Sequence, residues 1–278
     1  MLLTLTASSL RSMLARGKTG KPRLDLLDLP SFTRQDLNLH GLNLSTDLLA
    51  GVSREGLERL RERADKAGCA CLLLVEAEPQ AFGGTDESVT AGAVARVQNV
   101  VQAGHYLGCN AVAVRLAGAS DDADAFARTA QHLRKAVDRA EKLEMNVLIS
   151  PGPGIAPAPE HVTDLIKKVG GFRVGTYPDF EAAAGSADPV AYLRRLTPYA
   201  SAVCAATQKI EEGKGGLTHP AYDLAPLIEA ILSVGYDGTL AIDYRGTGDA
   251  RLGVERSRML LERLLGEDGP EPNDEDDS

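Results

Sequence analysis

Short runs of apolar residues alternate with longer amphipathic segments along most of the chain. Eight runs have the length expected of strands, and most are apolar throughout, which is typical of parallel strands buried on both faces. They lie at residues 2–7, 41–46, 69–76, 111–116, 146–150, 172–177, 201–205 and 239–244. The segments between them repeat apolar positions at helical spacing, as helices packed against a core do.

Residues with strong preferences for helix ends mark several of these segments. Ser53 precedes one of them and Gly68 follows it, while Gly108 ends the next. Acidic residues follow Ser120, and because they favour a helix N-terminus we expect Ser120 to cap a helix there. The expected helices lie at residues 31–38, 53–68, 87–108, 121–143, 161–169, 188–196, 222–234 and 249–265.

Eight strand–helix units within about 265 residues match the number and length of a (β/α)8 TIM barrel. The competing architecture is an open, doubly wound sheet, but no G-x-G-x-x-G motif follows the first strand. We therefore expect an α/β protein with a single-domain TIM barrel over residues 1–265. The segment 17–40 adds material between the first two strands, which could cover the rim of the barrel or serve as a protein-interaction surface.

The formal charge of −9 is concentrated at the C-terminus. Seven carboxylates and no basic residue follow Gly266, which leaves −2 on the rest of the chain. Because this stretch also contains two prolines, we expect a disordered acidic tail over 266–278. The body carries no basic stripe of the kind that binds a phosphate backbone, so nucleic acid is not an expected partner.

Other sequence features bear on the compartment of the protein. No apolar run approaches the roughly 18 residues of a membrane helix, and we expect no membrane association. The four cysteines show no C-x-x-C pair and no metal-ligand spacing, which is typical of thiols in a reducing compartment. Basic residues near the N-terminus weakly resemble a transit peptide, but the same stretch contains the first strand. We expect a cytoplasmic protein, and the sequence leaves a homo-oligomer open.

In a (β/α)8 barrel the functional site lies at the C-terminal ends of the strands. No histidine falls at such an end, so a transition-metal site rich in imidazole is not expected. The polar and reactive residues that do fall there are Asn43, Ser45, Glu76, Glu78, Arg115, Ser150, Tyr177, Asp179, Cys204, Thr207, Asp243, Tyr244 and Arg245.

Asp179 and Asp243 form the most suggestive pair among these candidates. Their strands are two apart, so both carboxylates can reach the mouth of the barrel. They could bridge a divalent cation, or one could act as an acid and the other as a base. Equally, each could cap a neighbouring loop or pair with Arg115 or Arg245.

The segment 208–223, after the seventh strand, is long, polar and rich in glycine. It could close over the site as a lid and present Lys209, Lys214 and His219 to a phosphate or carboxylate. It could equally be a mobile loop without that role. Lys214 does not belong to a P-loop, because no G-K-[ST] sequence begins a helix here.

Four segments carry a resemblance to a known family: LGCNAVAVRLAG at 107–118, NVLIS at 146–150, VGTYPDF at 174–180 and GYDGTLAIDYRG at 235–246. Over about residues 2–265 the chain resembles the sugar phosphate isomerase/epimerase family, the xylose isomerase-like TIM barrels. That family includes ketose 3-epimerases, hydroxypyruvate isomerase and inosose dehydratase. The resemblance implies a small sugar or sugar phosphate as ligand and, for an enzyme, an intramolecular proton transfer.

Members of that family typically hold a divalent metal with Glu, Asp, His and Glu from the fifth to the eighth strands. The resemblance places Ser150, Asp179, Cys204 and Asp243 at these positions. Asp179 keeps the residue type of the family, while Asp243 is one methylene shorter than the usual Glu. The two aspartates supply at most two hard anionic ligands, which fits a weak Mn²⁺ or Mg²⁺ site at best.

Three functions follow as hypotheses. The first is a carbohydrate-binding barrel with a degraded metal site, either non-catalytic or altered in its chemistry. The second is an active, divalent-metal-dependent sugar isomerase or epimerase, with Asp179 and Asp243 as metal ligands and with Asp243 and Glu76 as catalytic residues. The third is a protein-interaction scaffold. The side chains expected to bind a substrate are those of Asn43, Arg115, Ser150, Cys204 and Arg245.

Overall fold

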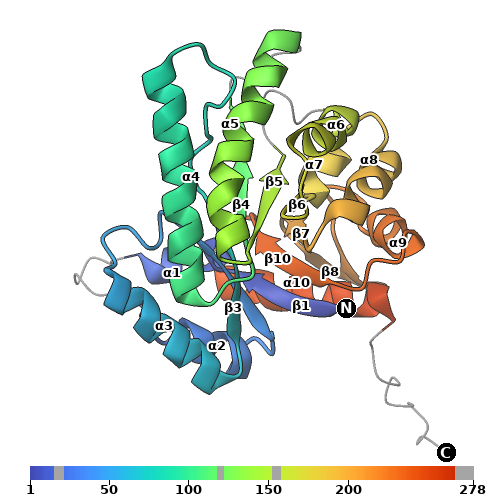
Figure 1. The fold of residues 1–278 in the computed structure, drawn as a ribbon. Helices are drawn as coiled ribbons and strands as arrows, with labels where there is room; N and C mark the ends of the chain where they lie inside the picture. The colour runs from blue at the N-terminus through green and yellow to red at the C-terminus, as the bar shows by residue number, and fades with distance from the viewer. Residues whose placement is uncertain (16–21, 118–121, 152–157, 267–278) are drawn as a thin grey trace, which may run out of the picture.

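The computed structural model describes residues 1–15, 22–117, 122–151 and 158–266. Its main sheet is built from the strands β1 (Leu2–Thr6), β2 (Gly41–Ser45), β3 (Ala70–Val75), β4 (Ala111–Arg115), β5 (Asn146–Ser150), β6 (Val174–Thr176), β7 (Ala202–Thr207) and β10 (Thr239–Tyr244). All neighbouring strands run parallel, in the order β6-β5-β4-β3-β2-β1-β10-β7, and helices lie outside the curved sheet (Figure 1). The predicted (β/α)8 TIM barrel is therefore confirmed.

The two ends of this sheet, β6 and β7, meet through single bridges. One bridge joins Thr176 to Ala200 and the other joins Asp179 to Cys204. The backbone N–H of Cys204 also donates a hydrogen bond to the carbonyl oxygen of Pro178 at 2.8 Å. This closure brings Asp179 and Cys204 side by side at the mouth of the barrel.

The helical elements are η1 (Ala7–Leu10), α1 (Arg11–Leu14), α2 (Leu29–Gln35), α3 (Arg54–Ala67), α4 (Glu87–Leu107), α5 (Ala123–Lys142), α6 (Pro159–Val169), α7 (Phe180–Ala184), α8 (Pro189–Leu196), η2 (Thr197–Tyr199), α9 (Ala225–Ser233) and α10 (Ala250–Leu265). The predicted ends of α3 are confirmed, with Ser53 as its N-cap and Gly68 in a left-handed conformation after it. The prediction that Ser120 caps α5 was wrong. Asp122 is the cap, because its carboxylate accepts the N–H groups of the first helical turn.

The inner face of the barrel is lined by a cluster of mostly small apolar residues, many of them alanine. Side chains alternate between the two faces of a strand, so residues two apart share a face. Arg115, Ser150 and Asp243 each lie two positions after a member of this cluster, on β4, β5 and β10 respectively. The strand pattern therefore directs these polar side chains into the barrel at its C-terminal end.

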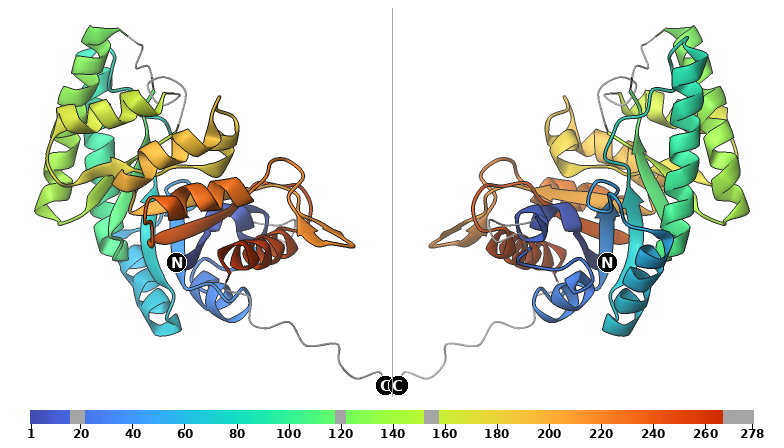
Figure 2. Two further views of the ribbon diagram at one scale, coloured as in Figure 1. Left: turned by 90° about the vertical axis from the view of Figure 1, so that its right-hand side faces the viewer. Right: turned by 90° about the vertical axis from the view of Figure 1, so that its left-hand side faces the viewer.

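The segment 208–223 contains an antiparallel hairpin of β8 (Glu211–Gly213) and β9 (Gly216–Thr218), which the sequence analysis did not predict. The hairpin extends from the body of the barrel beside α10 (Figure 2). It is fastened there by an ion pair of 3.0 Å between Arg256 and Glu212, and by a hydrogen bond from Arg263 to the carbonyl oxygen of Leu217 at 2.7 Å. The two strands, with the sequences EEG and GLT, contain a single apolar residue and carry no apolar alternation, so periodicity cannot reveal them.

Two other expectations concern the ends of the chain and the membrane. The N-terminal stretch forms strand β1, paired with β2 and β10, as the barrel requires. The predicted acidic tail lies outside the described residues, apart from Gly266, which ends α10 in a left-handed conformation. Among the helices that the structure describes, none is long and apolar enough to cross a membrane.

The closure between β6 and β7 leaves no room for a side chain at Gly175. A Cβ there would lie 2.4 Å from the carbonyl oxygen of Tyr199, which is backbone and cannot move aside easily. Gly175→Ala is expected to lower the free energy of unfolding by about 2–3 kcal/mol, measured by chemical denaturation. The matched control is Gly92→Ala on α4, where a Cβ meets no atom within 4 Å and the gain in helix propensity is up to about 1 kcal/mol. Equal stability of the two variants would contradict this view of the closure.

Candidate functional site

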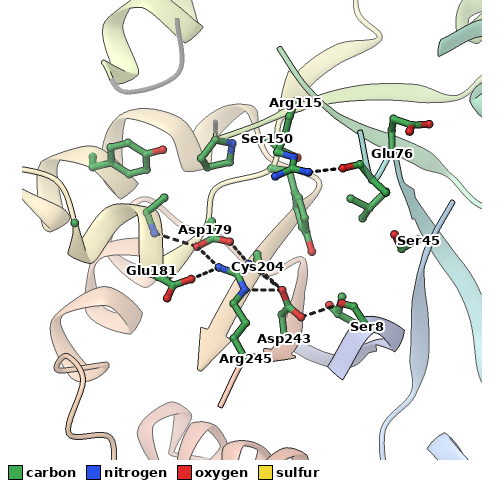
Figure 3. Close-up of a pocket in the computed structure, with 18 of the residues that line it drawn as sticks. Ser8, Ser45, Glu76, Arg115, Ser150, Asp179, Glu181, Cys204, Asp243 and Arg245 are labelled. Atoms are coloured by element: carbon green, nitrogen blue, oxygen red, sulfur yellow. Dashed lines mark hydrogen bonds and ion pairs between the residues drawn. The ribbon is translucent and has the colours of Figure 1, made fainter. Parts of the chain in front are cut away.

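A pocket with a volume of about 690 Å³ opens at the C-terminal ends of the barrel strands (Figure 3). This volume is typical of small-molecule binding sites. Of the residues predicted to form the site, those that line it are Glu76, Arg115, Ser150, Asp179, Cys204, Asp243 and Arg245. Asn43 is fully buried below them, where its amide donates a hydrogen bond to the hydroxyl of Thr4 at 2.8 Å. Of the thirteen strand-end candidates, nine line the pocket, since Ser45 and Tyr177 do so as well. The four that do not are Asn43, Glu78, Thr207 and Tyr244.

The guanidinium of Arg245 lies among three carboxylates on one side of this pocket (Figure 3). Its Nη2 is 2.5 Å from Asp179 Oδ2, its Nη1 is 2.5 Å from Glu181 Oε2, and its Nε is 2.9 Å from Asp243 Oδ2. The side chains of Asp179 and Asp243 are only 12% and 13% exposed. The two aspartates predicted as metal ligands therefore share a permanent cation from the protein itself.

Local structure explains how the three acids come together. Asp179 is the N-cap of α7, with its Oδ1 accepting the N–H of Ala182 at 3.0 Å, and this places Glu181 in the first helical turn. Asp243 and Arg245 leave β10 two residues apart, and Ser8 donates a hydrogen bond to Asp243 Oδ1 at 3.1 Å. Sequence reasoning missed Glu181 and Ser8. The capping position of Asp179 could have indicated Glu181, whereas Ser8 carries no comparable signal.

Charge and burial together set the pKa values of the groups in this cluster. The hydrogen bond from Arg245, assisted by one from Gln208, holds the pKa of Glu181 below its usual value. Burial works to lower the pKa of Arg245, but the acidic groups around it raise that pKa above its ordinary range. Burial, reinforced by Asp179 and Asp243, raises the pKa of the Cys204 thiol well above its usual value. Cys204 is therefore a neutral thiol at physiological pH.

Three hydroxyl groups in the pocket wall have no hydrogen-bond partner among the described residues. They belong to Thr6, Ser150 and Tyr177, whose side chains come from β1, β5 and the end of β6. All three residues are buried. Burial also raises the pKa of the Tyr177 phenol well above its usual value, so the group stays protonated and can donate a hydrogen bond.

Glu76 lies at the edge of the pocket, with a fully buried side chain. Its Oε2 accepts a hydrogen bond from Arg96 Nε at 2.8 Å, and its Oε1 accepts the N–H of Glu78 at 3.0 Å. Figure 3 shows the carboxylate directed away from the Arg245 cluster. Arg115 lies nearer the centre and donates a hydrogen bond to the carbonyl oxygen of Ala77. The structure thus places Glu76 against α4, while Arg115 faces the cavity.

A chain of hydrogen bonds joins the Arg245 cluster to the segment 208–223. Glu181 Oε1 accepts a bond from the side chain of Gln208 at 2.7 Å, and the backbone N–H of Gln208 donates to His219 Nε2 at 2.8 Å. Because Nε2 is an acceptor, the ring proton is on Nδ1, which donates to the carbonyl oxygen of Tyr222 at 2.7 Å. His219 therefore holds this segment in place from a buried position.

In the described part of the chain, no three or more His, Cys, Asp or Glu side chains are grouped so that they could hold a metal ion. The acidic side chains at the pocket that come closest to such a group are the three that bind Arg245. The assignment of Asp179 and Asp243 as metal ligands stays a prediction.

Loss of Arg245 leaves two nearly buried carboxylates without their cation. Arg245→Met is therefore expected to lower the free energy of unfolding at pH 7 by about 3 kcal/mol, measured by chemical denaturation. Arg61→Met is the control, because the ion pair of Arg61 with Asp65 is exposed and its loss is expected to cost less than about 0.5 kcal/mol. If the two variants lose equal stability, the Arg245 cluster is not a main stabilising contact.

The lowered pKa of Glu181 predicts a dependence of stability on pH. Below its usual pKa of 4.5, the unfolded chain binds a proton at this group more readily than the folded chain does. The stabilisation from Glu181 is thus present above about pH 4.5 and is lost as the pH falls through the lower pKa of the folded state. Glu181→Gln is expected to reduce the loss of unfolding free energy between pH 6 and pH 3, measured by chemical denaturation at each pH. Glu229→Gln, at an exposed position on α9, should leave this pH dependence unchanged. A pH dependence that Glu181→Gln does not alter would contradict the assignment.

Comparisons with known proteins agree with this architecture. The family model for the xylose isomerase-like TIM barrel matches residues 35–264. Solved structures with a similar fold include an L-ribulose 3-epimerase, at 15% identity over 96% of this chain and 95% of that chain, with a TM-score of 0.79. No curated protein matches the chain.

Two further solved structures have a similar fold. One is a D-psicose 3-epimerase in the presence of D-fructose, at 14% identity over 96% of this chain and 100% of that chain, with a TM-score of 0.75. The other is the IOLI protein with a bound zinc atom, at 12% identity over 96% and 99%, with a TM-score of 0.73. Because the family model covers most of the residues, the chain belongs to the xylose isomerase-like TIM barrel family.

Proposed function

We propose that this protein is a carbohydrate-binding member of its family in which Arg245 takes the place of a divalent metal, and that it does not carry out metal-dependent isomerisation. The observation that carries the proposal is the position of the Arg245 guanidinium among Asp179, Glu181 and Asp243. Two of these acids are the ones that the family resemblance assigns to metal binding.

Electrostatics supports this proposal. A guanidinium stays charged at every relevant pH, so the carboxylates around Arg245 already have a cation. At an effective dielectric constant of about 20, a divalent ion 4 Å from a guanidinium is repelled by about 8 kcal/mol. A metal ion that ligates these carboxylates would have to displace Arg245 from its ion pairs or lie beside a permanent cation.

The other two positions that the resemblance assigns to metal ligands also favour the proposal. Ser150 offers a hydroxyl where a carboxylate would serve both as ligand and as base. Cys204 offers a thiol whose pKa is raised by burial, and metal ions bind the thiolate form. Together with Arg245, these residues do not fit a divalent metal centre, so we assign no step to one.

A carbohydrate ligand suits the lining of the pocket. Hydroxyl groups without partners can donate to and accept from the hydroxyls of a sugar, while the carboxylates around Arg245 can accept further hydrogen bonds. The epimerases among the similar structures act on sugars by their names, L-ribulose and D-psicose, and this likeness supports the same class of ligand here.

Thermal unfolding after treatment with chelator tests the metal part of the proposal. Titration with Mn²⁺, Mg²⁺ or Zn²⁺ is expected to leave the Tm of the wild-type protein unchanged, because binding to the native state alone would raise it. Arg245→Met frees the carboxylates and is expected to gain a saturable rise in Tm with Mn²⁺, which a further Asp179→Asn change removes.

A saturable rise in the wild-type protein that Asp179→Asn abolishes would instead support the alternative, an active metal-dependent isomerase using Asp179 and Asp243. A rise in Tm with ketoses and other sugars, in the absence of metal, is expected under our proposal. Failure of every sugar to bind would overturn it and leave the protein-interaction scaffold as the remaining hypothesis.

A further inference from the structure

The three unpartnered hydroxyls of the pocket wall call for a ligand. Thr6, Ser150 and Tyr177 are 6%, 7% and 5% exposed, and their hydroxyl oxygens have no partner in the described part of the chain. Buried polar groups are nearly always hydrogen-bonded, because an unsatisfied one costs about 1–3 kcal/mol. All three belong to the lining of a single cavity, so one bound molecule can satisfy them.

A cationic group adjoins two of these hydroxyls. Arg115 and Ser150 are paired across the β4–β5 ladder, and Tyr177 follows on the next strand, where its N–H donates to the carbonyl oxygen of Ile149 at 2.9 Å. Neighbouring strands are about 4.8 Å apart, so the three side chains succeed one another along one wall. Figure 3 shows Arg115 and Ser150 together at one end of the pocket, away from Arg245.

The other basic side chains of the lining already have carboxylate partners. Arg11 pairs with Asp47, and Arg245 lies among three acids. Arg115 donates to the carbonyl oxygen of Ala77, and no carboxylate of the described residues pairs with it. Arg115 is thus placed to bind an anionic group of a ligand.

The Arg245 end of the pocket has the opposite character. Three carboxylates surround one guanidinium there, so this end carries net negative charge and favours hydrogen-bond donors such as sugar hydroxyls. A dianionic phosphate would meet this negative cluster within the same cavity. A planar carboxylate carries a single charge and matches the fork of one guanidinium, with the Ser150 hydroxyl as an additional donor.

We infer that the ligand is a sugar acid, a polyhydroxylated monocarboxylate whose carboxylate binds Arg115 and Ser150 and whose hydroxyls face Tyr177 and the Arg245 cluster. This assignment rests on the proposed function, because it specifies the class of carbohydrate that the same pocket binds. It accounts at once for the Arg115 guanidinium without a carboxylate partner, the unsatisfied hydroxyls of Ser150 and Tyr177, and the separation of charge along the pocket.

Isothermal titration calorimetry with D-gluconate and D-glucitol tests the assignment, since the two probes differ in the carboxylate. Wild-type protein is expected to bind gluconate at least tenfold more tightly than glucitol. Arg115→Met is expected to raise the dissociation constant for gluconate at least tenfold and to leave that for glucitol unchanged. Arg54→Met, which changes an arginine on the outer surface of α3, should alter neither constant.

A second pair of variants separates a binding role from a structural one. Ser150→Ala and Tyr177→Phe are expected to weaken gluconate binding while the Tm of the ligand-free protein stays equal or rises, because the deleted hydroxyls have no partner there. A lower Tm with unchanged binding would assign these hydroxyls to the scaffold and overturn the inference.

The remaining outcomes distinguish this inference from the proposed function. Equal affinity for gluconate and glucitol would overturn the sugar acid and leave a binding site for neutral carbohydrates. Tighter binding of D-glucose 6-phosphate than of gluconate would overturn it in favour of a phosphorylated sugar. An absence of binding by all three probes and by neutral ketoses would overturn the inference and the proposed function together.

Discussion

The Arg245 guanidinium is the group that allows three carboxylates to lie together at the mouth of this barrel. Two like charges 4 Å apart repel by about 4 kcal/mol at an effective dielectric constant of 20, so Asp179 and Asp243 need a cation between them. In a metal-dependent barrel that cation is exchangeable, whereas here it is a side chain of the residue that directly follows β10. Arg245 therefore offsets part of the negative charge of these carboxylates as soon as the chain folds.

The position of this cluster depends on how the barrel closes. β6 and β7 meet through single bridges, one of which joins Asp179 to Cys204, and the chain turns into α7 immediately afterwards. Asp179 consequently serves two roles, as the N-cap of α7 and as an ion-pair partner of Arg245. Because the same residue bridges to Cys204, caps α7 and binds the guanidinium, the closure of the barrel and the organisation of its pocket are physically coupled.

Hydrophobic periodicity and the positions of strand ends predicted the barrel and most of the polar residues in the pocket wall, because burial of strands and helices is a repeated, local signal. The same logic included Asn43, which lies deeper, since spacing alone does not say how far along the axis a side chain sits. Pairing with Arg245 remained one of several alternatives, because it depends on side-chain direction across strands. Glu181 and the short hairpin β8–β9 escaped prediction, since each owes its place to tertiary contacts rather than to a repeating pattern.

The pocket contains two kinds of polar group, and their contrast separates structural from ligand-binding roles. The carboxylates around Arg245 have partners within the protein in the absence of a ligand. The hydroxyls of Thr6, Ser150 and Tyr177 have none among the described residues, at a cost of about 1–3 kcal/mol each. The free energy of unfolding of whole proteins is only about 5–15 kcal/mol, so unsatisfied hydroxyls without a function would remove a large fraction of it. Their place in the lining of the pocket is what a binding site requires, because a ligand can recover the cost only where the protein has left its own hydrogen bonds unmade.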